Sequence, residues 1–409
     1  MGAPREFFAV RTVGEALAGF RPARRTGLEM VALAGALGRV PGEPVLAPED
    51  LPGFARSTVD GYAVRAGDTY GASEGLPGYL DLLGEVRMGA PAAVGLVPGG
   101  AVTIPTGAVL PPGADAVVMV EHTQQPMAGT VEVMRPVAPG EGVVRADEDA
   151  RAGAELVPAG RPLRAHDLGL LAAAGVIRLA VHTRPRVAIL STGDEVVDPA
   201  TPQLETGQVR DTSTVALAAL TVEAGGEPVP RGIVPDDRVA LEAALAAALA
   251  AADVVVVSAG SSVGGRDETA AAVAALGPPG IWCHGLAVRP GKPTLLAECD
   301  GVPVLGLPGN PRSALVVFRL VGMPLVRRAG GWDVAPAEPA TRARLARDLA
   351  SAAGRLDVVQ VRVRDGVATP LFGASALLSI LTAADGFVVI DEPATGLAAG
   401  SEVDVTLYG

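Results

Sequence analysis

The sequence predicts a multidomain protein in which a doubly wound α/β domain lies between β-rich segments. Between Arg184 and Arg328, short apolar runs alternate with stretches of helical spacing, a pattern typical of a parallel sheet covered by helices on both faces. Residues 41–160 and the segment after Gly331 instead combine many Gly and Pro residues with short alternating runs, which indicates β structure. The 409 residues are enough for about two to four domains.

The flanking segments are assigned in chain order. Residues 1–40 are predicted to be helical, because amphipathic stretches with Arg and Glu extend to Gly38. Residues 162–176 are again predicted to be helical. The first β-rich segment contains the predicted strands Ala101–Ile104, Ala116–Val120 and Val131–Met134. A small C-terminal β domain, with a barrel as one arrangement, is predicted from the strands Asp357–Val363, Gly386–Ile390 and Glu402–Leu407.

The central α/β domain is expected to span about 145 residues. Its predicted strands are Arg186–Leu190, Pro228–Ile233, Val254–Val257 and Val302–Leu307. Its predicted helices are Thr212–Ala224, Asp236–Ala252, Glu268–Leu276 and Pro311–Arg328. Ligands of such a domain bind outside the carboxyl ends of the parallel strands, so a site is expected in the loops that follow the strands.

The composition excludes several classes of function. The formal net charge of −12 and the isoelectric point of about 4.9 argue against broad nucleic-acid binding, so an anionic ligand must meet a local basic pocket. Cys283 and Cys299 have no CxxC spacing and the four histidines are scattered, which argues against a zinc site. We expect a cytoplasmic protein without a membrane segment, because Met1–Val10 carries charges and Asp253 splits the longest apolar run.

The first loop after a predicted strand is Ser191-Thr192-Gly193-Asp194-Glu195. A glycine turn with hydroxyls can present backbone N–H groups to an anion. The two carboxylates suit a hard cation such as Mg²⁺ or a ligand amine. An ordinary loop with a helix-capping acid is the alternative interpretation.

The second loop, residues 258–267, is rich in Gly and Ser, so a phosphate or a sugar can approach its backbone. Its candidate ligand residues are Gly260, Ser262 and Gly264. Asp267 is either a metal ligand or the N-cap of the next helix. The spacing fits neither a Walker A loop nor a dinucleotide-binding GxGxxG, which disfavours an ordinary NTPase or dehydrogenase.

The third loop contains Pro308, Gly309, Asn310, Arg312 and Ser313. Asn is a suitable N-cap and the following proline suits a first helical turn, so free helix N–H groups are predicted to point out of the sheet edge. Together with the adjacent cation they form a candidate anion cradle. An ordinary helix start explains the Asn-Pro pair but not the whole cluster.

Lys292 is the only lysine among the 33 basic residues, and it lies near Arg289 in the sequence RPGKP between the second and third loops. A lysine ammonium is a compact point charge for a phosphate or an oxyanion, whereas arginine offers a planar fork. Uniqueness alone does not distinguish this role from that of an ordinary surface lysine. The neighbouring loops favour electrostatic attraction of an oxyanion.

These loops, in this order, resemble the MoeA and gephyrin E-domain family, the molybdopterin molybdenumtransferases. The N-terminal half agrees: the sequence STVDGYA at Ser57–Ala63 is similar to one family signature. Ile104–Ala108 followed by Pro112–Val118 is similar to a second. The resemblance covers essentially the whole chain, and its six modest motifs are specific because they occur in register.

The resemblance implies four regions. They are an elongated helical N-terminal region at 1–60 and 146–183, an inserted β domain at 61–145, a MogA-like molybdopterin-binding α/β domain at 184–330, and a C-terminal β barrel at 333–409. It also implies a homodimer with a site shared between subunits, and molybdopterin-pathway enzymes as partners. The implied reaction uses adenylylated molybdopterin, molybdate and Mg²⁺, and yields molybdenum cofactor and AMP.

The family's functional polar residues correspond to Asp60, Thr106, Asp149, Glu195, Asp236 or Asp237, and Asp267. The first three are expected to face the site from the partner subunit. The candidate Mg²⁺ ligands are Glu195, Asp267 and Asp237. The choice between Asp237 and its neighbour Asp236 stays open, with Asp236 as a candidate helix cap.

The chain departs from the family pattern at Ala259, Ser261, Ser213 and Arg289, which we interpret as tolerated variants. The preference between molybdate and tungstate stays open, because both are tetrahedral oxyanions of similar size. A molybdopterin adenylyltransferase is disfavoured by the extensive regions outside the α/β domain. A non-catalytic scaffold is the third hypothesis, disfavoured because the chain has no long linker or appended second enzyme domain.

Overall fold

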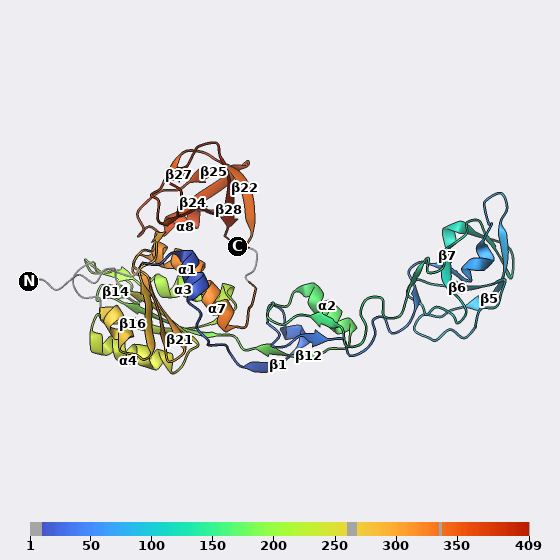
Figure 1. The fold of residues 1–409 in the computed structure, drawn as a ribbon, viewed down its shortest axis with the longest axis horizontal. Helices are drawn as coiled ribbons and strands as arrows, with labels where there is room; N and C mark the ends of the chain where they lie inside the picture. The colour runs from blue at the N-terminus through green and yellow to red at the C-terminus, as the bar shows by residue number, and fades with distance from the viewer. Residues whose placement is uncertain (1–9, 260–267, 335–337, 409) are drawn as a thin grey trace, which may run out of the picture.

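The computed structural model describes residues 10–259, 268–334 and 338–408. Figure 1 shows an elongated molecule, with an α/β domain and a β barrel at one end and a small β domain at the other. A slender segment joins the two ends. The chain runs out along this segment and returns beside itself, because β1 (Leu28–Ala32) pairs antiparallel with β12 (Arg178–His182). No helix in the described parts of the chain is long and apolar enough to cross a membrane.

The α/β domain contains a six-stranded sheet in the order β16-β13-β17-β21-β20-β18. The first four strands of this order are mutually parallel, β20 is antiparallel to its neighbours β21 and β18, and β18 therefore runs in the direction of the first four. The strands are β13 (Arg186–Thr192), β16 (Glu227–Val234), β17 (Val254–Ala259), β18 (Pro279–His284), β20 (Leu295–Cys299) and β21 (Val302–Pro308). The four predicted strands are confirmed. β18 and β20 are not predicted from the sequence, because they lie beside Pro and Gly residues that suggest loops.

Helices pack on both faces of this sheet, which confirms the doubly wound arrangement. The first face is covered by α3 (Ser213–Glu223), α6 (Pro311–Val317), the π-helical turn Phe318–Gly322 and α7 (Met323–Ala329), and the second by α4 (Arg238–Leu249) and α5 (Glu268–Ala274). In β13, Val187 and Ile189 enter the first core while Ala188 and Leu190 enter the second. Burial of a large apolar side chain contributes roughly 1.5–3 kcal/mol, so both faces hold the strand in place.

The N-terminal segment is less helical than its sequence suggests. The only α-helix among residues 10–40 is α1 (Val13–Gly19), which begins at a capping box between Thr12 and Glu15. The prediction of helix is wrong for Leu28–Ala32, because this segment forms β1. Long-range pairing with β12 outweighs a weak local helical spacing.

α1 lies apart from the slender segment that its chain then enters. Its Val13 and Ala16, and Phe20 after it, are buried in the same core as the first face of the α/β sheet. The predicted region boundaries at 1–60 and 146–183 remain a prediction. The packing of α1 adds that the N-terminal residues stabilise the α/β domain.

The slender segment is held by a few short elements. They are β1 and β12, the pair β2 (Val45–Leu46) and β11 (Glu155–Val157), the pair β3 (Arg56–Ser57) and β10 (Val143–Val144), and α2 (Ala165–Ala173). The predicted helix at 162–176 is confirmed in α2. Leu163, Leu171 and Val181 form the centre of its small core.

The small β domain has a six-stranded sheet in the order β7-β4-β6-β5-β9-β8. The strands are β4 (Gly61–Val64), β5 (Gly78–Glu85), β6 (Gly100–Ile104), β7 (Ala116–Met119), β8 (Thr123–Met127) and β9 (Thr130–Val133). The three strands predicted here are confirmed. Two cores lie on the two faces of this sheet, one around Leu80 and Val131 and the other around Val86 and Val102.

The C-terminal domain is a closed barrel of five strands, in which each strand pairs with two others. The strands are β22 (Ala340–Leu345), β24 (Leu356–Arg364), β25 (Val367–Pro370), β26 (Gly386–Ile390) and β28 (Glu402–Leu407). The predicted β barrel is thus confirmed. β19 (Val288–Arg289) extends it from the α/β domain by parallel pairing with β24, which joins the two domains.

Replacing Asp167 by Asn is expected to destabilise the slender segment at neutral pH. The Asp167 carboxylate is 5% exposed and accepts hydrogen bonds from Arg161 Nη1 at 2.7 Å and Nη2 at 2.9 Å, and from the Arg164 N–H at 2.7 Å. The Arg161 hydrogen bonds, supported by Arg164 and opposed by burial, hold the pKa of Asp167 well below its usual range. We expect Asp167→Asn to lower the free energy of unfolding by about 2–3 kcal/mol at pH 7.

The pH dependence of this loss has a definite sign. A lowered folded-state pKa stabilises the fold fully above the unfolded pKa of about 3.9, and this contribution is lost as the pH falls toward the folded pKa. The difference between Asp167→Asn and wild type should therefore shrink below about pH 4. Hydrogen exchange of the α2 amides measures this difference in stability at each pH, and Asp81→Asn, at an exposed position, is the control. An equal loss at pH 3 and pH 7 would contradict the assignment.

Candidate functional site

Three loops of the α/β domain begin at the same edge of the sheet. The parallel register pairs Ser191 with Ser258 and Ser258 with Leu307, so β13, β17 and β21 end at one level. The chain continues from β13 to β16 on one side and reaches β17 on the other, which makes the β13–β17 boundary a topological switch point. Ligands of open α/β sheets bind at such a point.

A cleft of about 500 Å³ opens at this edge. Its described lining residues come from the ends of β13, β17 and β21, the segment before α3, and the barrel: Ser191, Thr192, Glu195, Val196, Leu204, Gln208, Val209, Arg210, Asp211, Thr212, Ser213, Ser258, Gly309, Asn310, Pro311, Ala376 and Leu378. A cavity of this size fits a cofactor-sized ligand.

The first loop is fixed by its own polar side chains. Thr192 Oγ1 donates a hydrogen bond of 2.5 Å to Asp236 Oδ1, and the Asp236 N–H donates to Asp194 Oδ1 at 3.2 Å. Ser191 Oγ lies 3.0 Å from Thr214 Oγ1. Ser191 and Thr192 are buried, whereas Glu195 is exposed and lines the cleft. Glu195 is therefore the carboxylate of this loop that is available to a ligand.

Asp236 and Asp237 have different structural roles, which the sequence leaves open. Asp237 Oδ1 accepts a hydrogen bond of 2.9 Å from the Ala240 N–H and is the N-cap of α4. Asp236 is thus not the cap, and it instead holds the first loop through Thr192. The predicted role of Asp237 as a metal ligand remains a prediction.

Asp211, which lies before α3, lines the cleft although no sequence pattern predicts it there. Its carboxylate is 6% exposed and Oδ1 accepts a hydrogen bond of 3.0 Å from the Thr214 N–H. Nearby, Arg210 donates from Nε to the Thr201 carbonyl at 3.0 Å. The short parallel ladder of β14 (Val196–Val197) and β15 (Val209–Arg210) brings this segment to the cleft. Two-residue strands give no sequence periodicity, so only the acidic residue at the helix start is a usable signal.

The third loop lies at the carboxyl end of β21, but the contacts of its Asn310 and Arg312 side chains differ from the predicted cap and anion contact. Asn310 occupies the N-cap position of α6 with proline at the next position, and its side chain makes no capping hydrogen bond. The Arg312 guanidinium donates to the Gly373 carbonyl at 2.9 Å, and the Arg312 N–H donates to the Ser375 carbonyl at 3.2 Å. Burial, followed by repulsion from Arg289, lowers the pKa of Arg312. Arg312 therefore anchors a barrel loop beside the cleft.

Lys292 lies at the edge of the sheet that carries the cleft. β20 runs antiparallel to β21 with Leu295 opposite Gly306, so the residues before Leu295 lie beside the carboxyl end of β21. The Lys292 carbonyl accepts hydrogen bonds of 2.9 Å from the N–H groups of Leu286 and Thr294, while its side chain is exposed. The backbone of this turn is fixed and the ammonium is free to reach toward a ligand.

Arg289 lies on the same turn, next to the barrel. Its guanidinium is 3.9 Å from the carboxylate of Asp357, a partner that Arg355 already holds at 2.7 Å. The Arg289 side chain is 65% exposed. The Arg289 guanidinium is therefore only weakly paired and remains accessible to a ligand.

Not all predicted residues meet at the cleft. The structure brings Ser191, Thr192, Glu195, Gly309 and Asn310 into its lining. The predicted residues Gly193, Asp194, Arg289, Lys292, Pro308, Arg312 and Ser313 lie on the same loops and turn but not in the described lining. Gly260, Ser262, Gly264, Asp267 and the departure at Ser261 lie outside the described residues.

Asp60 and Thr106 meet each other at the far end of the molecule. The Thr106 N–H donates a hydrogen bond of 2.7 Å to Asp60 Oδ1, because β4 and β6 pair with Gly61 opposite Ile104. Asp149 lies in the slender segment between β10 and β11, where its N–H donates to the Leu51 carbonyl at 2.9 Å. Figure 1 shows the small β domain separated from the α/β domain by the whole slender segment. One chain by itself does not bring these residues to the cleft.

The donor set limits how Mg²⁺ can bind. In the described part of the chain, no three Asp, Glu, His or Cys side chains are grouped so as to hold a metal ion. An all-protein metal cage is therefore not formed by these residues. Mg²⁺ that bridges substrate phosphates needs only one or two carboxylates. The exposed Glu195 fits that arrangement.

Three family models match successive parts of the chain. A model described as MoeA N-terminal region (domain I and II) matches residues 11–175, a probable molybdopterin binding domain matches 188–328, and MoeA C-terminal region (domain IV) matches 342–408. The chain belongs to the MoeA family. The resemblance predicted from the loop motifs is thereby confirmed.

Relatives of the MoeA family are similar over most of their length. A molybdopterin molybdenumtransferase of Nostoc sp. is 40% identical over 74% of this chain and 70% of that protein. One of Haemophilus influenzae is 31% identical over 93% of this chain and 94% of that protein. The crystal structure of the MoeA protein of Pyrococcus horikoshii OT3 matches with a TM-score of 0.84 and 30% identity, over 98% of this chain and 100% of that one.

Gly291 shapes the turn that carries Lys292, so Gly291→Ala is expected to destabilise the protein. Its φ of +128° favours glycine, and an added Cβ would clash with the Val317 side chain of α6. We expect a loss of about 3 kcal/mol in the free energy of unfolding, measured by urea denaturation. Gly354→Ala is the matched control, because φ is +91° but the space is open, and it should cost about 1 kcal/mol. Equal losses in the two variants would contradict this role of Gly291.

Proposed function

We propose that this protein is a molybdopterin molybdenumtransferase of molybdenum cofactor biosynthesis. In the proposed reaction it binds adenylylated molybdopterin and molybdate, and yields molybdenum cofactor and AMP. The observation that carries the proposal is the 500 Å³ cleft at the switch point of the α/β sheet, with Lys292 and Arg289 at the same edge. The names of the relatives and the match of residues 188–328 to a probable molybdopterin binding domain support it.

The cleft offers complementary groups for a pterin. Asp211 presents a carboxylate that is 6% exposed, and such a group accepts hydrogen bonds from the amine and ring N–H donors of a pterin. Ser191 and Ser258 bring hydroxyls to the cleft from neighbouring strands. A ligand that covers Asp211 without donating a hydrogen bond to its carboxylate would leave a buried acceptor unsatisfied. Asp211 would therefore favour a pterin over a ligand of similar shape that lacks these N–H donors.

The cations at the edge supply the attraction for the anionic parts of the substrates. The protein has a formal net charge of −12, so molybdate and the phosphates are repelled at long range and need a local positive field. Lys292 and Arg289 supply this field from one turn, at the side of the cleft where β21 ends. Their proposed role is to hold the oxyanions and not to act as nucleophiles.

Glu195 is the proposed carboxylate for Mg²⁺, together with Asp267 as the sequence predicts. Held by Glu195, Mg²⁺ would supply charge neutralisation that makes the adenylate a better leaving group. Glu195 would orient the phosphates by this contact.

We further propose that the working form is a homodimer with a shared site. The functional residues predicted in the N-terminal half, Asp60, Thr106 and Asp149, lie at or near the far end of the same chain. An elongated subunit that packs antiparallel beside a second copy would place them near the partner's cleft. Two-fold symmetry then creates two equivalent sites from two incomplete ones.

Lys292→Arg tests the role of the ammonium. The variant keeps the charge but changes its geometry, so the fold should be retained while the affinity for molybdate falls about tenfold. AMP release from adenylylated molybdopterin, measured against molybdate concentration, shows the shift. Arg344→Lys, an exposed substitution on β22, is the matched control for exchanging one cation for another away from the cleft. An unchanged molybdate dependence would contradict the role of Lys292, and absence of AMP release in the folded wild type would contradict the function itself.

Mixing two inactive variants tests the shared site. If Glu195 acts in one subunit and Asp60 in the other, a mixed dimer of Glu195→Gln and Asp60→Asn has one intact site and one doubly altered site. Random pairing should therefore restore about a quarter of the wild-type activity, because half of the dimers carry one working site of two. AMP release is measured after co-expression and compared with each variant alone. Failure of co-expression to restore activity, with mixed dimers present, would place both residues in the same subunit's site.

A further inference from the structure

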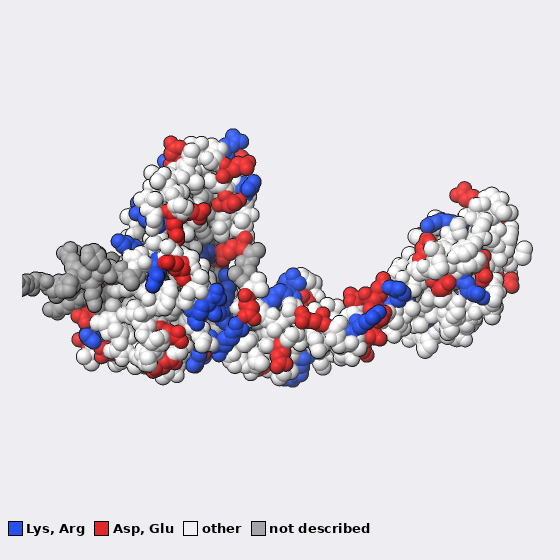
Figure 2. Space-filling model, in the orientation of Figure 1, with Lys and Arg blue, Asp and Glu red and all other residues white. Residues whose placement is uncertain are grey.

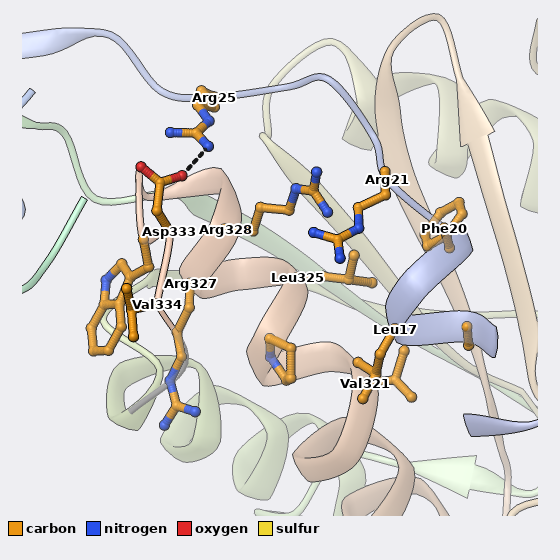
Figure 3. A pocket seen from close by; sticks show the side chains of 13 residues that line it. Leu17, Phe20, Arg21, Arg25, Val321, Leu325, Arg327, Arg328, Asp333 and Val334 are labelled. Carbon is orange, nitrogen blue, oxygen red and sulfur yellow. Dashed lines mark hydrogen bonds and ion pairs between the residues drawn. The ribbon is translucent and has the colours of Figure 1, made fainter. Parts of the chain in front are cut away.

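A second cavity, of about 350 Å³, lies on the first helical face of the α/β domain and away from the cleft. It is formed by α1 and the segment after it, by α7, and by residues 332–334, as Figure 3 shows. Arg24 in the segment after α1 pairs at 3.2 Å with Asp253, the residue before β17 begins. The cavity therefore lies toward the amino ends of the parallel strands, at the edge opposite to the cleft.

Four arginines line this cavity: Arg21, Arg25, Arg327 and Arg328. The one acidic residue of the described lining is Asp333, which Arg25 already engages at 2.6 Å. Figure 3 shows the Arg21 and Arg328 side chains directed toward each other from opposite walls. Figure 2 shows a gathering of basic side chains over this part of the molecule, in a protein whose net charge is −12.

The facing pair has no acidic partner among the residues that the structure describes. Arg21 donates only from Nε to the Ala18 carbonyl at 3.0 Å, and no ion pair joins Arg328 to a described acid. Burial lowers the pKa of Arg328, and repulsion from Arg21 and Arg25 lowers it further, while attraction to Asp333 opposes this shift. Asp333, the acidic residue of the described lining, is paired with Arg25 and offsets the repulsion between Arg21 and Arg328 only in part, so a bound anion would reduce it further.

A structural role accounts for only part of the cluster. Arg327 and Arg328 occupy the last turn of α7, where cations interact favourably with the helix dipole. Arg327 also stacks on Trp332 at 5.5 Å and lies 3.6 Å from Glu338, although its buried Nε has no hydrogen-bond partner. Helix-end stabilisation does not explain why Arg21, on another segment, points at Arg328.

We propose that this cavity is a second binding site, for a small organic phosphate. The phosphate lies between the guanidinium groups of Arg21 and Arg328, which suit bidentate recognition of its oxygens. The organic part packs on the apolar wall, where Leu17, Val321 and Leu325 line the cavity. The volume is within the range of small-ligand sites, and the mixture of an apolar wall with a few convergent cations is typical of them.

Calorimetric titration of the full-length protein with phenyl phosphate tests this site, in about 20 mM salt so that screening is weak. We expect binding with a Kd on the order of 0.1 mM, and weaker binding of inorganic phosphate, which lacks the apolar part. Arg21→Gln and Arg328→Gln should each weaken binding at least about tenfold. Arg344→Gln, an exposed charge on the barrel, should leave it unchanged. Lys292→Gln should also retain it, which separates this cavity from the proposed active site.

Thermal unfolding gives a second readout that a purely structural role would not produce. Phenyl phosphate should raise the melting temperature of wild type but not of the Arg21→Gln/Arg328→Gln variant. No binding at about 5 mM phenyl phosphate would overturn the proposal. So would affinity unchanged in both arginine variants, or affinity lost in Lys292→Gln, which would assign the ligand to the cleft.

Discussion

Parallel pairing of β13, β17 and β21 positions every other part of the candidate site. These strands are buried on both faces, since successive residues enter two separate cores. A shift of one residue would exchange the two sets of side chains between the faces, so burial fixes the register strongly. Because Ser191 is aligned with Ser258 and Ser258 with Leu307, the loops that follow must begin at one level. The cleft is the consequence of that alignment.

The antiparallel pairing of β20 with β21 also positions the cations Lys292 and Arg289. β20 pairs with β21 and thereby brings the Lys292 turn to the carboxyl edge, and β19 on the same stretch pairs with the barrel strand β24. The barrel in turn receives the Arg312 guanidinium and contributes Ala376 and Leu378 to the cleft. The charged groups and the walls of the cleft are thus held by one continuous set of backbone pairings.

The slender segment holds the small β domain away from the cleft of the same chain. Its short β-ladders keep the small β domain far from the α/β domain of the same chain (Figure 1). Rigid local pairing of this kind does not fold back within one chain. This separation is the reason for proposing a site shared between two subunits. The first helical face of the α/β domain, with its arginine-lined cavity, lies at the base of the slender segment.

The sequence by itself determined the α/β pattern, the loops at its carboxyl edge and the family, because strand burial, glycine turns and a lone lysine are local signals. It predicted a helix where β1 forms, and it missed β18, β20 and the segment around Asp211. Tertiary structure decided these, since pairing partners distant in the chain stabilise strands too short or too irregular to show periodicity. It also decided that Asp237 caps α4 while Asp236 holds Thr192, and that Arg21 faces Arg328. Such roles depend on which side chains meet in space, and residue type alone does not specify them.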